Sequence, residues 1–164
     1  MTASQEESLQ KMAESMFALA KMAWRQRLAS RRRDEEELSE SQFLTLDLLI
    51  THDKPQTVGD VMRAIHVAPA QMSRVIRSLE NDFAGPLIRC ELNQRDKRKI
   101  DVHLTAAGRN AYEQFRDARL RRSREILAGL SERDRIDFVR ICGQMRKLYA
   151  KAEQGGQDES PPST

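Results

Sequence analysis

Apolar residues recur every three to four positions along most of the chain, and this pattern predicts a mainly helical protein. It indicates six helices, over about residues 4–30, 39–52, 57–65, 69–80, 105–128 and 131–150. Two segments, 87–92 and 100–104, are short and bounded by turn residues, and in the second the apolar residues alternate as in a half-buried strand. The predicted order is therefore a run of helices, one two-stranded hairpin, and two further helices.

Several helix starts carry recognisable capping residues. Ser39 and Gln42 have the spacing of a capping box, in which each side chain bonds the backbone N–H of the other residue. Thr57 and Thr105 also precede helical patterns as N-cap residues. Pro69 fits the first turn of a helix, where its missing N–H costs nothing.

The composition favours a single water-soluble domain. The 164 residues are 39% hydrophobic and 32% charged, and the low counts of 7 Gly and 5 Pro argue against an all-β sandwich. No segment approaches the roughly 18 apolar residues of a membrane span, so no membrane partner is expected. Residues 1–9 contain acids rather than a basic and then apolar signal sequence, so we expect a cytoplasmic protein.

Catalytic and metal-binding classes find little support in the sequence. Cys90 and Cys142 are far apart and lack CxxC spacing, and the three histidines show no metal-ligand spacing. No nucleophile motif and no phosphate-binding loop is present. We therefore expect neither an enzyme nor a bound cofactor or metal.

The kind of basic residue is more informative than the net charge. Lys plus Arg number 28 against 25 acids, a formal net charge of +3, but 21 of the 28 are Arg. Arginine's planar fork pairs with phosphates and with guanine edges. High-GC codon usage also enriches arginine, so the positions of these residues must decide.

The centre of the chain has the pattern of a winged helix-turn-helix. The helix at about 69–80 places its apolar residues on one face and offers Gln71, Ser73, Arg74 and Arg77 elsewhere. Such side chains can pair with adenine and guanine edges in the major groove. The small residues Ala68, Pro69 and Ala70 let the start of this helix approach the bases closely.

The hairpin tip, residues 93–99, points to the same chemistry. It contains four basic residues and one acid, a local charge of +3: Arg95, Asp96, Lys97, Arg98 and Lys99. A narrow loop tipped with arginine suits the strong negative potential of the minor groove. A solvated turn is the alternative for this loop alone, but the preceding helix-turn-helix favours DNA binding.

These motifs resemble a known family. DKR at 96–98 and LTAAGR at 104–109 resemble the DxR…LTxxGR wing signature of the MarR transcription regulators. Three further segments are similar to helices of that family. Residues 39–43 resemble the start of its second helix, residues 57–61 the start of the first helix of its helix-turn-helix, and residues 67–79 its recognition helix. The resemblance covers about residues 8–150, and it departs at 81–86, where the turn is longer, and at Cys90, where the family often has arginine.

The resemblance implies a homodimer that places each recognition helix in a major groove and each wing in a minor groove. Arg98 would be the minor-groove arginine, and Asp96 would brace the wing through a salt bridge. It also implies repression of a nearby operon that is relieved by a small aromatic or phenolic ligand, or by oxidation.

The terminal helices give an independent argument for a dimer. The helices at 4–30 and 131–150 carry broad apolar faces, and a winged-helix core of about 90 residues cannot cover both. The expected dimerisation residues are Leu9, Met12, Met16, Phe138, Ile141, Met145 and Leu148. The predicted organisation is a dimerisation helix and charged linker (1–38), the DNA-binding domain (39–108), dimerisation helices (109–152) and a disordered tail (153–164).

The effector and two alternatives remain open at this point. An effector pocket between the dimer helices and the DNA-binding core would be lined by Met16, Ala20, Trp24, Phe43 and Leu46, although such apolar residues are more often core. Alternatively, Cys90 would sense oxidation, which requires an exposed thiol with a lowered pKa. A winged-helix module that binds a protein instead of DNA is the other alternative.

Overall fold

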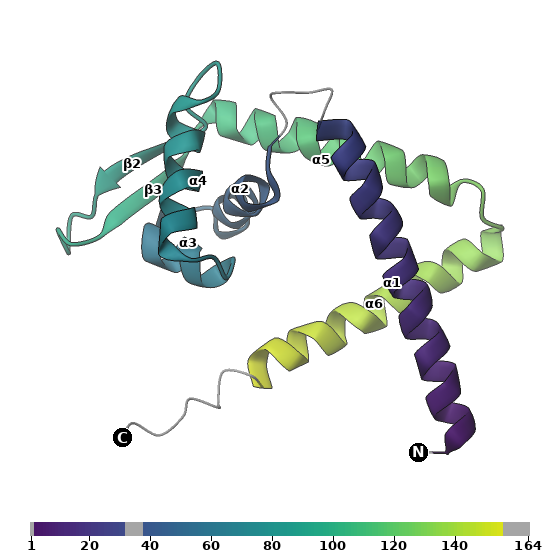
Figure 1. Cartoon of the computed structure of the whole chain (residues 1–164). Helices are drawn as coiled ribbons and strands as arrows, with labels where there is room; N and C mark the ends of the chain where they lie inside the picture. Colours follow the sequence, from purple (N-terminus) through teal and green to yellow (C-terminus); the bar gives the residue numbers. More distant parts are fainter. Residues whose placement is uncertain (1, 32–37, 156–164) are drawn as a thin grey trace, which may run out of the picture. The chain divides into compact units, whose positions relative to one another are not determined.

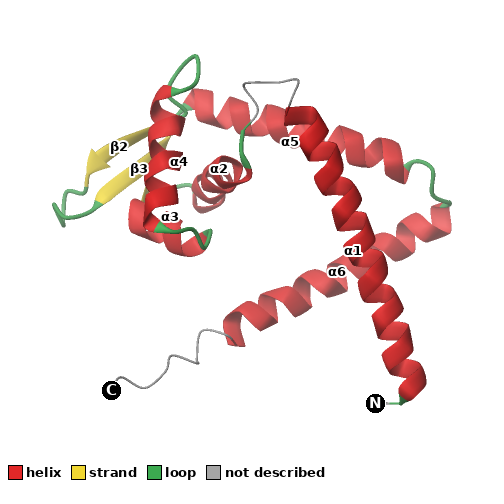
Figure 2. Cartoon of the chain, viewed as in Figure 1, coloured by secondary structure: helices red, strands yellow, loops and turns green. Residues whose placement is uncertain are grey.

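The computed structural model describes residues 2–31 and 38–155, and within these ranges the chain forms six helices and three short strands (Figures 1 and 2). In chain order these are α1 (Ala3–Arg31), α2 (Glu40–His52), β1 (Gln56–Thr57), α3 (Val58–Ala64), α4 (Pro69–Asn81), β2 (Ile88–Leu92), β3 (Ile100–Leu104), α5 (Ala106–Leu127) and α6 (Glu132–Gly155). The prediction of a mainly helical winged helix-turn-helix is confirmed.

The predicted caps account for where the helices begin. Ser39 and Gln42 form a complete capping box at α2, and Thr57 forms a second one with Asp60 at α3. Pro69 occupies the first turn of α4, after an N-cap alanine that makes no side-chain bond. The Thr105 hydroxyl accepts the Gly108 N–H at 3.0 Å and thereby caps α5.

The sheet has one strand more than the two predicted. The strand order is β1-β3-β2 with antiparallel neighbours, and β1 pairs through Gln56 with Val102 and through Thr57 with Asp101. A two-residue strand is too short to show an alternating pattern, so the sequence carried no signal for it. The consequence is that the residue capping α3 is also fixed to the wing strand β3.

The core lies under the helix-turn-helix and the base of the wing. Its completely buried side chains come from α2, α3, α4, β2 and β3: Leu46, Val61, Met72, Leu79, Ile88 and Val102. In Figure 1, α2, α3 and α4 gather beside the β2–β3 hairpin. The apolar face predicted for α4 is the face that this core buries, which leaves the polar face of α4 outside.

The segment between α4 and β2 contains the stretch that departs from the family pattern. The Leu87 N–H donates to the Leu79 carbonyl at 2.8 Å, so the residues between them form a closed loop. This bond attaches the start of the wing directly to the last turn of α4. The additional residues therefore lie within a loop whose two ends are held together.

The chain divides into two compact units, Met1–Phe115 and Arg116–Thr164. The predicted boundary after residue 108 differs from this division, because Tyr112 and Phe115 pack on Phe43 of the first unit. Helix α6 ends at Gly155, so residues 153–155, predicted as part of a disordered tail, are helical. Residues 156–164 of that tail and 32–37 of the charged linker lie outside the described residues.

The helices predicted to form a dimer expose their apolar side chains. On α1 Leu9, Met12 and Met16 are exposed, with fractions of 50%, 54% and 45%. On α6 Phe138, Ile141 and Leu148 are exposed and Met145 is half-buried. Among the described helices, none is both long and apolar enough to cross a membrane.

Candidate nucleic-acid interface

Helix α4 presents a polar face to solvent opposite its buried face. Exposed residues begin at the N-cap and continue through the helix: Ala68, Pro69, Ala70, Gln71, Ser73, Arg74 and Arg77. Among the described residues, the Arg74 and Arg77 guanidinium groups have no ion-pair partner. Both cations are therefore available to a polyanion.

The start of α4 has small side chains and free backbone donors. Its N-cap, Ala68, offers no side-chain oxygen to the first-turn N–H groups. The Ser73 hydroxyl donates to the Pro69 carbonyl at 3.0 Å and so turns back onto its own helix. The small residues at 68–70 thus let the start of α4 approach another molecule closely.

Two features fix α4 relative to the helices before it. His66 adopts a left-handed conformation with φ 52°, which permits the sharp turn between α3 and α4. The buried Gln42 side chain donates through Nε2 to the Ser78 hydroxyl at 2.8 Å and so joins α2 to α4. The Gln42–Ser78 contact was not predicted, because sequence spacing gives no information on a contact 36 residues apart.

The wing tip, residues 93–99, is shaped by one asparagine. The Asn93 Oδ1 accepts the backbone N–H groups of Arg95 and Asp96, both at 2.9 Å. Its Nδ2 donates to both carboxylate oxygens of Asp101 at 2.9 Å, which ties the loop to β3. Asn93 was missed as a functional residue, although asparagine at the start of a turn is a known signal for this bonding.

Asp96 lies inside the same loop. Its carboxylate accepts the Arg98 N–H at 3.1 Å and lies 3.7 Å from the Lys99 Nζ. Its backbone carbonyl accepts the Lys99 N–H at 2.9 Å. Asp96 is thus bonded within the wing loop, with Lys99 as its ion-pair partner; that it braces the wing for DNA binding stays a prediction.

The remaining cations of the wing point into solvent. Arg95, Lys97 and Arg98 are exposed, and within the described part of the chain none of them forms an ion pair. The Asn93 and Asp96 bonds fix the backbone of the loop and leave these three side chains uncompensated. The wing tip is therefore an ordered turn that carries three free positive charges.

Cys90 has an environment that disfavours thiol chemistry. Burial raises the pKa of the Cys90 thiol to about 12, and the nearby Glu80 carboxylate adds to this effect. The Glu80 carboxylate also accepts the Cys90 backbone N–H at 3.1 Å. Because the thiolate is the reactive form, this environment opposes the alternative in which Cys90 senses oxidation.

The five residues predicted for the effector pocket have different environments. Leu46 is completely buried in the core, and the Phe43 ring stacks on Tyr112 with a centroid distance of 5.1 Å. On α1, Met16 and Trp24 are exposed and Ala20 is half-buried. Phe43 and Leu46 therefore pack within the core of the first unit.

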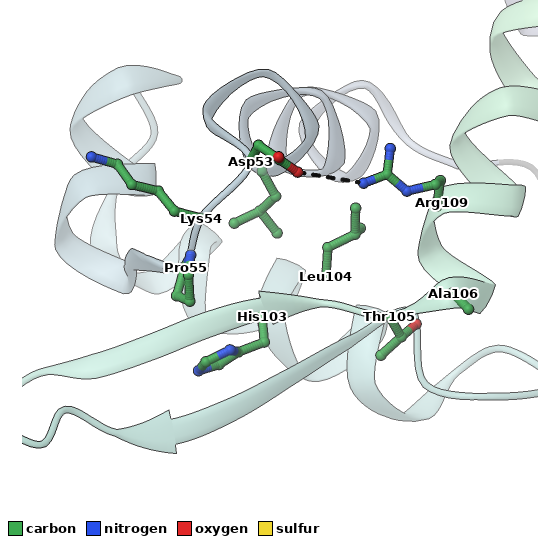
Figure 3. A pocket seen from close by; sticks show the side chains of 9 residues that line it. Asp53, Lys54, Pro55, His103, Leu104, Thr105, Ala106 and Arg109 are labelled. Atoms are coloured by element: carbon green, nitrogen blue, oxygen red, sulfur yellow. Dashed lines mark ion pairs between the residues drawn. The ribbon is translucent and has the colours of Figure 1, made fainter.

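A hollow of about 270 Å³ lies where the end of α2 and the start of α5 meet the end of β3 (Figure 3). It is lined by Leu49, Asp53, Lys54, Pro55, His103, Leu104, Thr105, Ala106 and Arg109, and by none of the five predicted effector residues. The Arg109 Nη2 faces the Asp53 carboxylate at 3.9 Å, so its charge is partly balanced. Elsewhere, the described residues contain no group of three or more His, Cys, Asp or Glu side chains placed to hold a metal ion.

Comparison with known proteins gives a clear result for the fold. No family model and no curated protein matches the sequence. Solved structures do match: the YusO protein from Bacillus subtilis is 22% identical, with a TM-score of 0.68 over 90% of this chain and 99% of that one. A MarR family protein from Bacillus stearothermophilus is 19% identical, with a TM-score of 0.67 over 93% of this chain and 99% of that one.

A third match is MepR, a transcription regulator of the Staphylococcus aureus multidrug efflux pump MepA. It is 20% identical, with a TM-score of 0.65 over 83% of this chain and 97% of the other. The matches extend over nearly the whole length of each of these solved chains. The chain therefore has the winged-helix fold of the MarR family structures.

Proposed function

We propose that this chain is a transcription regulator of the MarR family that binds double-stranded DNA sequence-specifically as a homodimer. The observation that carries the proposal is a pair of cationic sites on a winged-helix fold, one on α4 and one on the wing tip. Arg74 and Arg77 form the first, and Arg95, Lys97 and Arg98 the second; all five are exposed and lack an ion-pair partner among the described residues.

In this proposal α4 enters the major groove. Gln71, Arg74 and Arg77 reach base edges, since amide and guanidinium groups form paired hydrogen bonds with adenine and guanine. The small residues at 68–70 permit close approach, and the free N–H groups at the helix start favour a phosphate. The fold supports this reading, because MepR, which shares it, has been solved bound to an oligodeoxyribonucleotide.

The wing occupies the adjacent minor groove. Its tip is narrow and holds three uncompensated cations, and the minor groove concentrates negative potential where it is narrow. Asn93 and Asp96 keep the loop in one conformation before DNA arrives. Arg98 is the residue that we assign to the groove itself.

The dimer is formed by the terminal helices of two copies. Exposed apolar side chains on α1 and α6 would be costly in a monomer, and a second copy is the simplest cover for them. Met12→Lys and Ile141→Lys should each convert a dimer into a folded monomer in analytical ultracentrifugation. Lys21→Ala, a change on the same α1 helix, should leave the mass unchanged.

We further propose that the chain is a repressor released by a small aromatic or phenolic ligand. The DNA binding of BpsR from Bordetella bronchiseptica, a structural match, is regulated by 6-hydroxynicotinic acid. Trp24 is the single tryptophan of the chain, so its fluorescence reports on the predicted pocket. Titration with 4-hydroxybenzoate should quench Trp24 and release bound DNA, and a ligand that releases DNA without affecting Trp24 would place the pocket elsewhere.

DNA binding to the region upstream of the chain's own gene, titrated with salt, tests the proposal. We expect a footprint with two half-sites about one helical turn, roughly 10 bp, apart and a steep negative salt dependence. Arg74→Ala should alter the sequence preference, whereas Arg98→Ala should weaken binding to all sequences. No binding at low salt would overturn the DNA proposal and favour the protein-interaction module.

A further inference from the structure

The N-terminal turn of α2 contacts α4 at two points. The Gln71 Nε2 donates to the Ser41 hydroxyl oxygen at 3.1 Å, and the Gln42 Nε2 donates to the Ser78 hydroxyl at 2.8 Å. Ser41 and Gln42 are adjacent, and Gln71 and Ser78 are seven residues apart, about two helical turns, so they lie on one side of α4. Adjacent residues of α2 therefore hold α4 near its start and near its end.

The two glutamine amides differ in how many of their donors and acceptors are already bonded. Gln42 is buried, and its Oε1 accepts the Ser39 N–H at 2.7 Å while its Nε2 donates to Ser78. Gln71 is exposed, and among the described residues its amide has the Ser41 hydroxyl as partner, while its Oε1 and second N–H remain free. The Gln42 contact is thus structural, whereas the Gln71 contact leaves a donor and an acceptor available.

We propose that Ser41 is a positioning residue for DNA recognition: it holds the Gln71 amide in the orientation that reads adenine. An amide has one N–H on the side of its oxygen and one on the opposite side. When the hydrogen opposite Oε1 is the one donated to Ser41, the N–H beside Oε1 stays available, and together they are the donor and acceptor pair that adenine N7 and N6 require. This inference rests on the proposed function.

Orientation determines which base is read. A glutamine side chain rotates about three bonds and its amide can turn over, which exchanges the donor and the acceptor. An amide in the opposite orientation, with its NH₂ group facing the base pair, would instead donate to the N7 and O6 acceptors of guanine. In the contact that the structure shows, the Gln71 Nε2 and not its Oε1 lies at Ser41, and this orientation favours adenine over guanine at the base pair that Gln71 contacts.

Base-substituted duplexes test the proposal. Affinities for operators carrying each base at each position are compared for the wild type, Ser41→Ala, Ser41→Thr and Gln71→Ala. The operator base pair that Gln71 reads should be the one at which Gln71→Ala loses the preference for adenine. Ser41→Ala should reduce the preference for adenine over guanine there by about three- to tenfold, and Ser41→Thr, which keeps a hydroxyl, should retain most of it.

Additional measurements separate a positioning role from a general structural one. The double variant should match Gln71→Ala, because Ser41 acts through Gln71, and the salt dependence should not change. Thr51→Ala, an exposed change at the other end of α2, should leave the preference intact. A loss of affinity at all positions in Ser41→Ala, or an unchanged preference at the Gln71 position, would overturn the inference alone, whereas failure of the wild type to bind DNA would overturn the proposed function with it.

Discussion

Gly108 lies so close to the backbone of Leu87 that a β-carbon at position 108 would be 2.0 Å from the Leu87 carbonyl oxygen. The same carbonyl accepts the Thr105 N–H at 3.2 Å and the Thr105 hydroxyl at 3.0 Å. The start of α5 is therefore docked directly on the residue that precedes β2. This close approach is the physical reason for glycine in the LTAAGR segment.

Gly108→Ala should destabilise the protein by about 3 kcal/mol, because the contact is with rigid backbone and α5 or β2 must shift to accommodate the methyl group. Urea unfolding followed by circular dichroism measures this loss. Gly143→Ala is the matched control, since a β-carbon at position 143 in α6 meets nothing within 4 Å. That change should be neutral or stabilising by up to about 1 kcal/mol. Equal stabilities for the two variants would contradict the tight contact at Gly108.

The sequence predicted those parts of the fold whose signals are local. The capping residues Ser39 and Thr57 and the apolar face of α4 each follow from spacing within one helix, and the structure confirms them. The placement of the cations on α4 and on the wing tip also followed from the order and spacing of residues within those segments. How close Gly108 lies to Leu87 could not be predicted, because that distance depends on how α5 packs on another element.

The effector pocket illustrates another limit. Phe43 and Leu46 have the apolar spacing of core residues and of pocket residues alike, and here they pack within the core. Strand β1 and the bond between Ser41 and Gln71 left no pattern at all, since one is two residues long and the other joins distant helices. Periodicity identifies an apolar face but not the group that covers it.

Cys90 should react slowly with thiol reagents. With its pKa raised from 9.0 to about 12, the thiolate fraction at pH 8 falls roughly a thousandfold. In a Cys142→Ser protein, we expect iodoacetamide to label Cys90 at least about a hundredfold more slowly when folded than in urea. Glu80→Gln should speed the reaction, because it removes a carboxylate that raises the pKa, but burial should keep the rate below that of the unfolded chain.

Peroxide gives the functional counterpart of this measurement. DNA binding by the Cys142→Ser protein should be unchanged after exposure to hydrogen peroxide, because oxidation begins at the thiolate. Cys90→Ser serves as the comparison protein in which no thiol remains at position 90. Loss of DNA binding on oxidation in the protein that retains Cys90, but not in the one that lacks it, would restore the oxidation-sensing alternative.

The Thr57–Asp60 capping box should make stability depend on pH. The Thr57 hydroxyl bond lowers the pKa of Asp60 below its ordinary value of 3.8, with further lowering from the Thr57 backbone and Arg63 and opposition from burial. A carboxyl whose pKa is lowered by folding stabilises the folded state above its unfolded pKa. That contribution is lost as the pH falls through 3.8 and below.

Thr57→Ala should therefore cost about 0.5–2 kcal/mol at pH 7, the usual cost of removing an N-cap, and part of that difference should vanish below pH 3.8. Thr57→Ser keeps the hydroxyl and should behave like the wild type throughout. Urea unfolding at pH 7, 5, 4 and 3 gives the comparison. A difference between Thr57→Ala and wild type that stays constant with pH would show that the cap does not act through the Asp60 charge.

Asn93→Ala separates the shape of the wing from its charge. The substitution removes the side-chain bonds to the Arg95 and Asp96 N–H groups and to Asp101, yet it leaves every cation of the loop in place. A loop that must be ordered on binding loses conformational entropy at that moment, so affinity for DNA should fall about tenfold. Because the same phosphates are neutralised, the slope of log affinity against log salt should not change.

Arg98→Ala should differ from Asn93→Ala in its salt dependence, since it removes one cation and leaves the Asn93 bonds intact. Its affinity should also fall, but the salt slope should become shallower by about one. Gln94→Ala, at an exposed position of the same loop, should match the wild type in both respects. If Asn93→Ala changed the salt slope as much as Arg98→Ala does, the ordered loop would be needed to place its cations against phosphates, and the shape of the loop could not be separated from its charge. A tenfold loss at constant slope instead assigns Asn93 to pre-organisation of the wing.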